Sequence, residues 1–508
     1  MRRALRVAVL GVCLLAGSAH DGVAQRLLDV ETPAAEQAIW DTYSAVVHLQ
    51  LEEAHRLADT VGDDPNGAMA AAYLRSAIAM VQAFITGDPY DYDAFWIVSD
   101  ALKSVVRQQD ETQWSRYVDA ENNIYRTAAH MEAERVIRAA WAGRDAYKQL
   151  KALHKDFPEM REPLKSLGLL HIGIGSLPSG YQKLLRIVGF SGTVSEGLAE
   201  LRTAQHPDAL TQVDAAICQA LLDGMWNNSR GGAVPLIDSL AVAWPESPLV
   251  AYARAHVLNG NRRARDVAAL LEPLVYDRRP GEAQVTYASY YLAEAYFKLN
   301  RFADAEQALR TFIAEQQGEI LIASARYRLG LVLELQGQRD EALTWYQQVE
   351  ALRNFDSDDS AERNAKKRMV APLTEVERLL LQGRNAYDAG EYDEGIAILT
   401  PIAENADQAL AARAEAAYRL GRIYQALGDQ QAGLAWYTSA QEWAVPGTRW
   451  APYSAYYAGE VWEEEGNLEQ AKAAFDRALS YTGKYDHYQG LQQRVKAGYD
   501  RLAERGLP

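Results

Sequence analysis

Few side chains in this sequence have the spacing that catalytic or metal centres require. None of the nine histidines belongs to a His-Glu-x-x-His arrangement, and the only two cysteines, Cys13 and Cys218, lie far apart in the chain. A metal centre would therefore need ligands from distant segments. Carboxylates are too numerous to single out one acid and base pair. We expect no catalytic residue, no cofactor and no metal.

A glycine-rich segment from Gly173 to Pro178 does not match a nucleotide site either. It lacks the third glycine of a dinucleotide fingerprint, and no Gly-Lys-Ser/Thr phosphate loop occurs in the chain. Ser176 and Ser191 are not flanked by glycines at the spacing of a nucleophile elbow. The sequence therefore predicts a protein that is not an enzyme.

The C-terminal half of the chain repeats itself, and paired glycines mark the repeats. The first glycines are Gly330, Gly383, Gly421 and Gly459, and each is followed seven residues later by a second one, at Gly337, Gly390, Gly428 and Gly466. A residue without a Cβ lets two antiparallel helices approach closely, and glycine also adopts the positive φ that ends a helix. The pattern predicts successive helix pairs.

Further positions around these glycines complete a repeat signature. The clearest copies contain Leu329, Ala342 and Tyr346, then Leu420, Tyr424 and Tyr437, then Trp462, Ala471, Phe475 and Ala478. An earlier copy has Ala293 in place of the first glycine and Asn300 in place of the second. On these residues the chain resembles the tetratricopeptide repeat family over about residues 284 to 482. The resemblance implies an all-α fold, a right-handed α-solenoid of antiparallel helix pairs.

The rest of the chain is expected to be helical as well. Residues 37 to 160 carry apolar residues at helical spacing in long runs without proline. Ser247 stands where it would cap a helix opened by Pro248. We expect four segments: a signal peptide at 1–24, an N-terminal helical domain at 25–205, degenerate helical repeats at 206–276, and the tetratricopeptide-repeat domain at 277–508.

A cassette at residues 168–204 resembles the eukaryotic tetratricopeptide repeat protein 39 and outer-mitochondrial-membrane inclusion-body clearance family, and related bacterial repeat proteins. The matching residues are Gly168, Ser176, Leu177, Pro178, Leu184, Leu185, Gly189, Phe190, Ser191, Gly192, Gly197, Leu198 and Leu201. The chain departs from the family at Thr193 and Val194, where the family has Asp or Asn followed by Arg. Thr193 to Glu196 is typical of a capping box that opens a helix. We expect only the architecture to be shared.

The glycines also set the register of the first helix in each repeat. In repeats of this type its second, fifth, ninth and twelfth positions face the inside of the superhelix. We expect a protein-binding groove made of Tyr287, Tyr290, Glu294, Phe297, Tyr327, Glu334, Arg384, Tyr387, Tyr418, Arg422, Gln425, Tyr453, Tyr456, Glu460 and Glu463. The same positions also hold Ser324, Leu331, Glu377, Leu380 and Glu415.

This predicted groove is aromatic and acidic. Tyrosine offers rigid amphipathic contact area at little entropic cost, which suits a binding surface. The groove lacks the Lys/Asn set with which chaperone-tail-binding members of the family clamp a carboxylate, so that class of partner is disfavoured.

The first residues have the order of a secretory signal peptide. Arg2, Arg3 and Arg6 precede an apolar run that ends at Leu15, and small residues lead to Ala24. We expect cleavage after Ala24 and a periplasmic or secreted protein.

The apolar run is too short to cross a bilayer, and no later segment offers the uninterrupted apolar length that crossing requires. The bulky residue before Cys13 disfavours lipid attachment there, and Cys218 is expected in the core without a disulfide.

The formal net charge is −16, so the surface repels nucleic acid and anionic lipid. We therefore expect a protein or peptide partner and no nucleic acid. One irregular charged segment, from Asn354 to Met369, is typical of a solvated loop that runs into a helix. A docking site in this segment is the alternative interpretation.

Together these patterns favour an exported, non-enzymatic scaffold or adaptor that binds a protein or peptide partner along the concave face of its repeats. Two other hypotheses remain open. One is a helical enzyme or ligand receptor with a site near residues 168–192. The other is a structural component of an envelope assembly, associated peripherally with the membrane. The sequence leaves the partner and the oligomeric state open.

Overall fold

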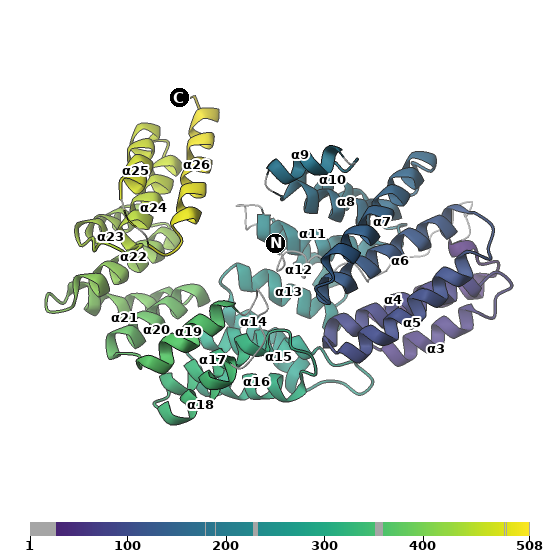
Figure 1. The fold of residues 1–508 in the computed structure, drawn as a ribbon, viewed down its shortest axis with the longest axis horizontal. Coiled ribbons are helices and arrows are strands. Elements are labelled where there is room, and N and C mark those ends of the chain that lie inside the picture. The colour runs from purple at the N-terminus through teal and green to yellow at the C-terminus, as the bar shows by residue number, and fades with distance from the viewer. Residues whose placement is uncertain are drawn as a thin grey trace. The chain divides into compact units, whose positions relative to one another are not determined.

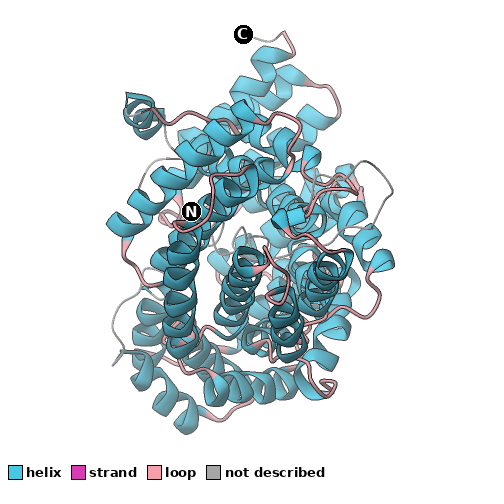
Figure 2. Ribbon diagram, turned by 90° about the vertical axis from the view of Figure 1, so that its right-hand side faces the viewer, coloured by secondary structure: helices cyan, strands magenta, loops and turns pink. Residues whose placement is uncertain are grey.

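The protein is described from a computed structural model. It describes residues 27–177, 179–187, 189–226, 232–350, 359–481, 483 and 485–506. Within these ranges every regular element is a helix and no strand occurs (Figure 1, Figure 2). The predicted all-helical class is therefore confirmed. The predicted signal peptide at 1–24, with Cys13, lies outside the described residues, as does Pro178 of the cassette.

The chain folds as two compact units. Unit 1 comprises Met1–Asn261, Asp266–Leu292 and Arg310–Ile322, and unit 2 comprises Arg262–Arg265, Ala293–Leu309 and Ala323–Pro508. Of residues 206–276, expected as degenerate repeats, all but Arg262–Arg265 therefore belong to the same unit as the N-terminal helices.

Unit 1 begins with a short 3-10 helix and continues with neighbouring helices that pack on one another. Its elements are η1 (Leu27–Asp29), α2 (Pro33–Val47), α3 (Leu51–Val61), α4 (Ala68–Thr86), α5 (Pro89–Val106), α6 (Gln113–Glu132), α7 (Val136–Asp156), α8 (Glu162–Gly175), α9 (Ser179–Ile187), α10 (Val194–Thr203), α11 (Gln212–Trp226), α12 (Ala233–Ala243), α13 (Pro248–Gly260) and α14 (Ala264–Tyr276). The closest neighbours are α4 with α5, α6 with α7, and α8 with α10.

Local chemistry explains where several of these helices begin. The hydroxyl of Ser247 accepts a hydrogen bond from the backbone N–H of Val250 at 3.0 Å, which confirms the predicted cap of α13. Thr32 and Asp88 cap α2 and α5 in the same way, each with a proline at the start of the helix. Such caps satisfy the backbone N–H groups that have no partner inside the first turn.

Helix α4 is long and apolar enough to cross a membrane by length and composition, but 72% of that window is buried. Its sequence is interrupted by polar residues such as Arg75 and Ser76. Ser76 is fully buried and donates to the side-chain oxygen of Asn122 on α6. The helix therefore lies in the core of unit 1.

A buried charge cluster joins three helices of unit 1. Lys165 of α8, Glu121 of α6 and Asp214 of α11 are all fully buried. The ammonium group of Lys165 donates to Glu121 and lies 2.9 Å from a carboxylate oxygen of Asp214. Ser166 donates to the other oxygen of Glu121 at 2.6 Å. Ionised carboxylates this deep are stable only when they are paired and hydrogen-bonded.

The cluster holds one cation for two carboxyl groups, so one of them is favoured in its neutral form. Burial raises the pKa of Asp214 well above its usual value, although the neighbouring Lys165 opposes this shift. The folded state therefore binds this proton more tightly than the unfolded chain does. The resulting stabilisation is complete below the pKa of the unfolded carboxyl, about 4, and is lost as the pH rises through the folded pKa.

We expect Lys165→Met to lower the free energy of unfolding by about 3–5 kcal/mol, because it leaves buried carboxylates without a cation. Asp214→Asn mimics the neutral acid and should cost about 1 kcal/mol or less at pH 7. The stability of Asp214→Asn relative to the unchanged protein should rise from pH 4 to pH 7. Urea unfolding followed by circular dichroism measures these differences, with the exposed Lys155→Met on α7 as control. Equal losses for Lys165→Met and Asp214→Asn would contradict this account.

Unit 2 contains the helix pairs that the glycine pattern predicts. The helices from α15 onward are α15 (Thr286–Lys298) and α16 (Phe302–Glu315), which contribute to both units, then α17 (Ile322–Leu335), α18 (Arg339–Glu350), α19 (Asp359–Val370), α20 (Glu375–Ala389), α21 (Tyr392–Glu404), α22 (Leu410–Leu427), α23 (Gln430–Glu442), α24 (Trp450–Glu464), α25 (Leu468–Ser480) and α26 (Tyr488–Glu504). The predicted helix at the end of the charged segment is α19. Residues 354–358 of that segment lie outside the described residues.

The first glycine of each repeat faces a large side chain of the second helix. A Cβ added to Gly421 would lie 2.5 Å from the ring of Tyr437, and Gly330 and Gly459 face Tyr346 and Phe475 in the same way. In the other repeat Leu399 takes the place of the ring against Gly383. The predicted role of these glycines is confirmed, since any side chain would push the two helices apart.

The second glycine of each repeat ends the first helix with a positive φ. These angles are 82° at Gly337, 86° at Gly390, 82° at Gly428 and 80° at Gly466. Asn300, which replaces the glycine in the earliest copy, has a φ of 55°. Asparagine is among the few residues that tolerate this region, so the predicted equivalence is confirmed.

We expect Gly421→Ala to destabilise unit 2 by about 1–3 kcal/mol, because Tyr437 is fully buried and cannot move away. Shortening the ring with Tyr437→Leu should relieve the clash, so the double variant should lose less than the sum of the two single variants. Gly428→Ala is the matched control: its Cβ meets open space, and its cost should add to that of Tyr437→Leu. Thermal unfolding of the set measures the coupling. Additivity at Gly421 would contradict the assigned contact.

Candidate functional site

The fifteen residues of the predicted groove do not share one environment. Six of them are buried, namely Tyr290, Phe297, Glu334, Tyr453, Tyr456 and Glu463. The others are at least partly exposed, namely Tyr287, Glu294, Tyr327, Arg384, Tyr387, Tyr418, Arg422, Gln425 and Glu460. The most open is Arg384, whose side chain is 52% exposed. Tyr287 and Tyr290 belong to unit 1, where both rings pack on Phe312.

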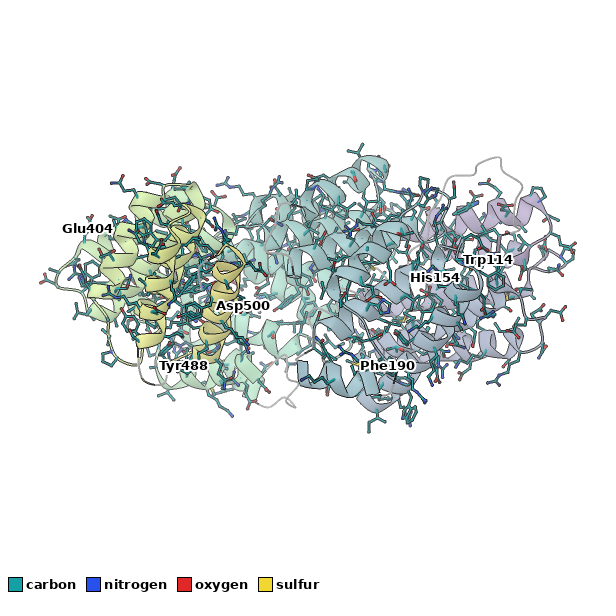
Figure 3. All side chains as sticks on the ribbon, turned by 90° about the horizontal axis from the view of Figure 1, so that it is seen from above. Trp114, His154, Phe190, Glu404, Tyr488 and Asp500 are labelled. Atoms are coloured by element: carbon teal, nitrogen blue, oxygen red, sulfur yellow. The ribbon has the colours of Figure 1, made fainter. Side chains whose placement is uncertain are left out.

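The expected groove positions on α24 are covered by α26, the last helix of the chain. Tyr488 and Asp500 lie toward the two ends of this helix (Figure 3). The hydroxyl of Tyr453 donates to the carbonyl of His487 at 3.0 Å. Arg501 donates to both carboxylate oxygens of Glu463, at 2.8 and 2.7 Å. Tyr453 and Glu463 are therefore not available to a partner as the helices pack here, while Glu460 stays partly exposed.

The expected acidic character of the groove is also neutralised by internal contacts. Glu294 accepts two hydrogen bonds from Arg328, at 2.7 and 3.2 Å. Glu334 accepts from the hydroxyl of Tyr346 at 2.8 Å and from the backbone N–H of Leu373 at 2.7 Å. The prediction of an acidic surface is wrong for these residues, because each carboxylate serves the packing of neighbouring helices.

A different surface forms where α20, α22 and the start of α24 meet. We call it the Arg–aromatic surface and define it by Tyr387, Tyr418, Arg419, Arg422, Arg449, Trp450 and Tyr457. Its central residue is Arg422, whose guanidinium lies 3.5 Å from the centre of the Tyr457 ring. Two of its nitrogens donate to the hydroxyl of Tyr387, at 2.8 and 3.2 Å. A guanidinium held over a ring in this way is stabilised by the negative face of the ring.

The remaining members extend this arrangement around Trp450. The guanidinium groups of Arg449 and Arg419 lie 4.7 and 5.2 Å from the centre of its ring. Tyr418 lies between the aromatic groups, 5.4 Å from Trp450 and 6.1 Å from Tyr457. Three arginines thus surround three connected rings.

The charges on this surface are only partly balanced. Arg419 pairs with Glu415 on its own helix. In the part of the chain that the structure describes, no carboxylate lies within ion-pair distance of Arg422 or Arg449, and one nitrogen of Arg422 is buried without an acceptor. Burial raises the pKa of Tyr418, so this phenol stays neutral and supplies no negative charge.

Exposed Arg384 belongs to the same positive environment. Partial burial lowers its pKa, and repulsion from Arg419, Arg328 and Arg449 acts in the same direction, while Asp388 opposes the shift. A cluster of guanidinium groups with few carboxylates is unusual in a chain whose net charge is −16. The arrangement can therefore bind an anionic group, with aromatic rings beside it for apolar contact.

Only part of this surface is predictable from the sequence. Tyr387, Tyr418 and Arg422 were predicted from the repeat register. Arg419, Arg449, Trp450 and Tyr457 were not, because they occupy other helical positions. The adjacent Arg449 and Trp450 at the start of the last repeat helix pair were the signal that could have indicated them.

The cassette of unit 1 is explained mainly by close helix packing. A Cβ on Gly197 would lie 2.3 Å from the carbonyl of Gly168, so the backbones of α10 and α8 touch. The hydroxyl of Thr193 accepts from the N–H of Glu196 at 3.1 Å, so Thr193 caps α10 as predicted, while the reciprocal bond of a capping box, from the N–H of Thr193 to the Glu196 side chain, is not formed. Phe190 packs on Tyr147 with 5.0 Å between ring centres. At Gly168 and Gly197 the two backbones therefore leave no room for a side chain between the helices.

A cleft of unit 1 lies elsewhere, between α5, α6 and α7. It has a volume of about 440 Å³ and is lined by charged groups of both signs, including Lys103, Arg107, Asp119, Asp145 and Lys148. It does not touch the cassette. The hypothesis of a ligand pocket near residues 168–192 gains no support from it.

Comparisons with known proteins agree with the repeat pattern. Two segments match models of the tetratricopeptide repeat, residues 290–358 and residues 414–444. No curated protein sequence matches the chain. Among solved structures, the crystal structure of the APC/C hetero-tetramer Cut9-Hcn1 is similar at 13% sequence identity and a TM-score of 0.28, covering 91% of this chain and 96% of that chain. That likeness is too weak to carry an argument about function.

None of these comparisons supports the resemblance of the cassette to the tetratricopeptide repeat protein 39 family, which stays a prediction. The chain therefore contains tetratricopeptide repeats, in an all-helical fold of the kind that such repeats build.

Proposed function

We propose that the protein is an exported, non-enzymatic scaffold that binds an extended acidic segment of a partner protein at the Arg–aromatic surface. Tetratricopeptide repeats suggest protein interaction in general. Export rests on the signal-peptide pattern at residues 1–24. The absence of any catalytic spacing in the sequence supports a binding role.

The observation that carries this proposal is the pair of arginines without carboxylate partners. Arg422 and Arg449 are held on aromatic rings, so their side chains are already ordered before a partner arrives. An ordered guanidinium loses little entropy when it binds, and it matches a carboxylate with two parallel hydrogen bonds. A partner rich in Asp and Glu would supply the missing negative charges.

The rings beside these arginines favour a peptide over a small anion. Tyr418 and Trp450 offer flat, partly exposed faces on which the stem of a Glu side chain or a neighbouring apolar residue can pack. Arg384, on the adjacent repeat, extends the positive charge along the helices. An extended segment with several carboxylates would reach more than one of these groups.

The test is the affinity of labelled peptides for the full chain, measured by fluorescence anisotropy. A Glu-rich peptide should bind, and a Gln-rich peptide of the same length should bind much more weakly. Affinity should fall with added salt, because the attraction is electrostatic. Arg422→Gln and Arg449→Gln should each weaken binding about tenfold, as expected for the loss of about 1.4 kcal/mol from a charged hydrogen bond.

The matched control is Arg477→Gln, because Arg477 is an exposed arginine on the second helix of a pair, α25. It removes the same charge from unit 2 but lies outside the Arg–aromatic surface, so affinity should stay within about twofold, since a distant exposed charge is screened by salt. Equal loss in Arg477→Gln and Arg422→Gln would mean that net charge alone drives binding. Equal affinity for the Glu-rich and Gln-rich peptides would overturn the proposed partner chemistry.

A further inference from the structure

The cassette of unit 1 brings together three side chains that the binding surface of unit 2 does not use. His171 comes from α8, while Glu196 and Glu200 lie one turn apart on α10. The Nδ1 atom of His171 is 2.7 Å from a carboxylate oxygen of Glu200 and 3.8 Å from one of Glu196. One ligand atom from each of the three residues lies within 4.8 Å of the others. We propose that these residues form a binding site for one divalent transition-metal ion such as Zn²⁺.

The spacing of the three donors fits such an ion. Zinc binds imidazole nitrogen and carboxylate oxygen at about 2.1 Å, so two donors of a tetrahedral site lie about 3.4 Å apart. The observed separations of 2.7 and 3.8 Å lie on either side of this value. Small rotations of the two glutamate side chains would equalise them. One imidazole and two carboxylates suit zinc and related first-row metals.

The charges of the three side chains also favour a bound cation. A neutral imidazole has one N–H, so Nδ1 can donate to only one of the two carboxylates. Two carboxylates one turn apart on a helix repel each other. Among the described residues no Lys or Arg lies within ion-pair distance of Glu196 or Glu200. A divalent cation would bind all three groups and balance both negative charges.

The surroundings hold the ligands in place. A Cβ on Gly192 would lie 2.7 Å from the ring of His171, so this turn packs directly on the imidazole. The ring of Tyr147 meets the imidazole edge to face at 5.7 Å, and its hydroxyl donates to the carbonyl of Ser191 at 3.0 Å. Such supporting contacts fix the orientation of a histidine ligand and raise metal affinity.

The site is open on one side. The side chain of Glu196 is 52% exposed, while those of Glu200 and His171 are 18% and 8% exposed. An ion can therefore enter past Glu196, and water can complete its coordination. The close contact between Gly168 and Gly197 is what brings α8 near enough to α10 for these ligands to meet. The ligands come from two helices with α9 between them, so they do not form a contiguous metal motif in the sequence.

The experiment is a calorimetric titration of the full chain with Zn²⁺, after removal of metals by a chelator and without a histidine tag. One Zn²⁺ should bind per chain with micromolar or tighter affinity, and thermal unfolding should shift to higher temperature. Glu196→Gln and Glu200→Gln should each weaken binding at least tenfold. Both keep a side-chain oxygen as acceptor, and Glu196 is exposed, so folding should survive, as circular dichroism can verify.

The control is Glu52→Gln, an exposed glutamate on α3, which should bind Zn²⁺ as the unchanged protein does. Absence of stoichiometric Zn²⁺ binding would overturn the proposal and leave a hydrogen bond between His171 and Glu200 as the whole role of the cluster. Unchanged affinity in both Glu196→Gln and Glu200→Gln would overturn it as well, because the ion would then bind elsewhere.

Discussion

The contact between a glycine of one helix and a ring of the next is the constraint on which the C-terminal repeats depend. At Gly421 the missing Cβ admits Tyr437, and the hydroxyl of Tyr437 donates to Gln425 at 2.7 Å. The ring of Tyr437 then stacks on Tyr457 with 6.3 Å between centres, and the guanidinium of Arg422 lies over the ring of Tyr457. A packing requirement thus leads, in three contacts, to the centre of the Arg–aromatic surface. Stability and the proposed binding role share the same side chains.

The two units differ in how their charged side chains are paired. In unit 1, Lys165 is fully buried beside two carboxyl groups, and the cluster ties together helices that are distant in the sequence. In unit 2, Arg422 and Arg449 lie on aromatic rings, and among the described residues no carboxylate lies within ion-pair distance of either. The first arrangement satisfies its charges internally and leaves nothing for a ligand. The second leaves positive charge for a partner to balance, which is why we place the proposed function there.

The sequence predicts local features of this fold well. The glycine pairs, the substitution by Asn300 and the cap at Ser247 each depend on residues close together in the chain, and all are confirmed. The repeat register predicts that α20 and α22 contribute to the Arg–aromatic surface, but it does not predict all the residues that form this surface. It could not foresee that α26 would cover Tyr453 and Glu463, because that depends on where the last helix docks.

Contacts between helices that are not consecutive in the chain could not be predicted from the sequence pattern. The ion cluster of Lys165 joins residues from α6, α8 and α11, and the ligands around His171 come from α8 and α10. Nothing in the spacing of these residues distinguishes them from ordinary helical charges. Their chemistry appears only when close backbone contacts, such as that of Gly168 with Gly197, set the distances between helices.

The proposed function depends on which segment lies on the Arg–aromatic surface in the cell. A photo-crosslinking amino acid at position 418, beside Trp450 and Tyr457, would report it directly, and one at position 479, an exposed leucine of α25, would serve as control. Mass spectrometry of the crosslinked peptides identifies their sequences. The account predicts that position 418 captures one partner segment rich in Asp and Glu and that position 479 does not. Capture of neutral or basic segments at position 418, or the same peptides from both positions, would contradict it.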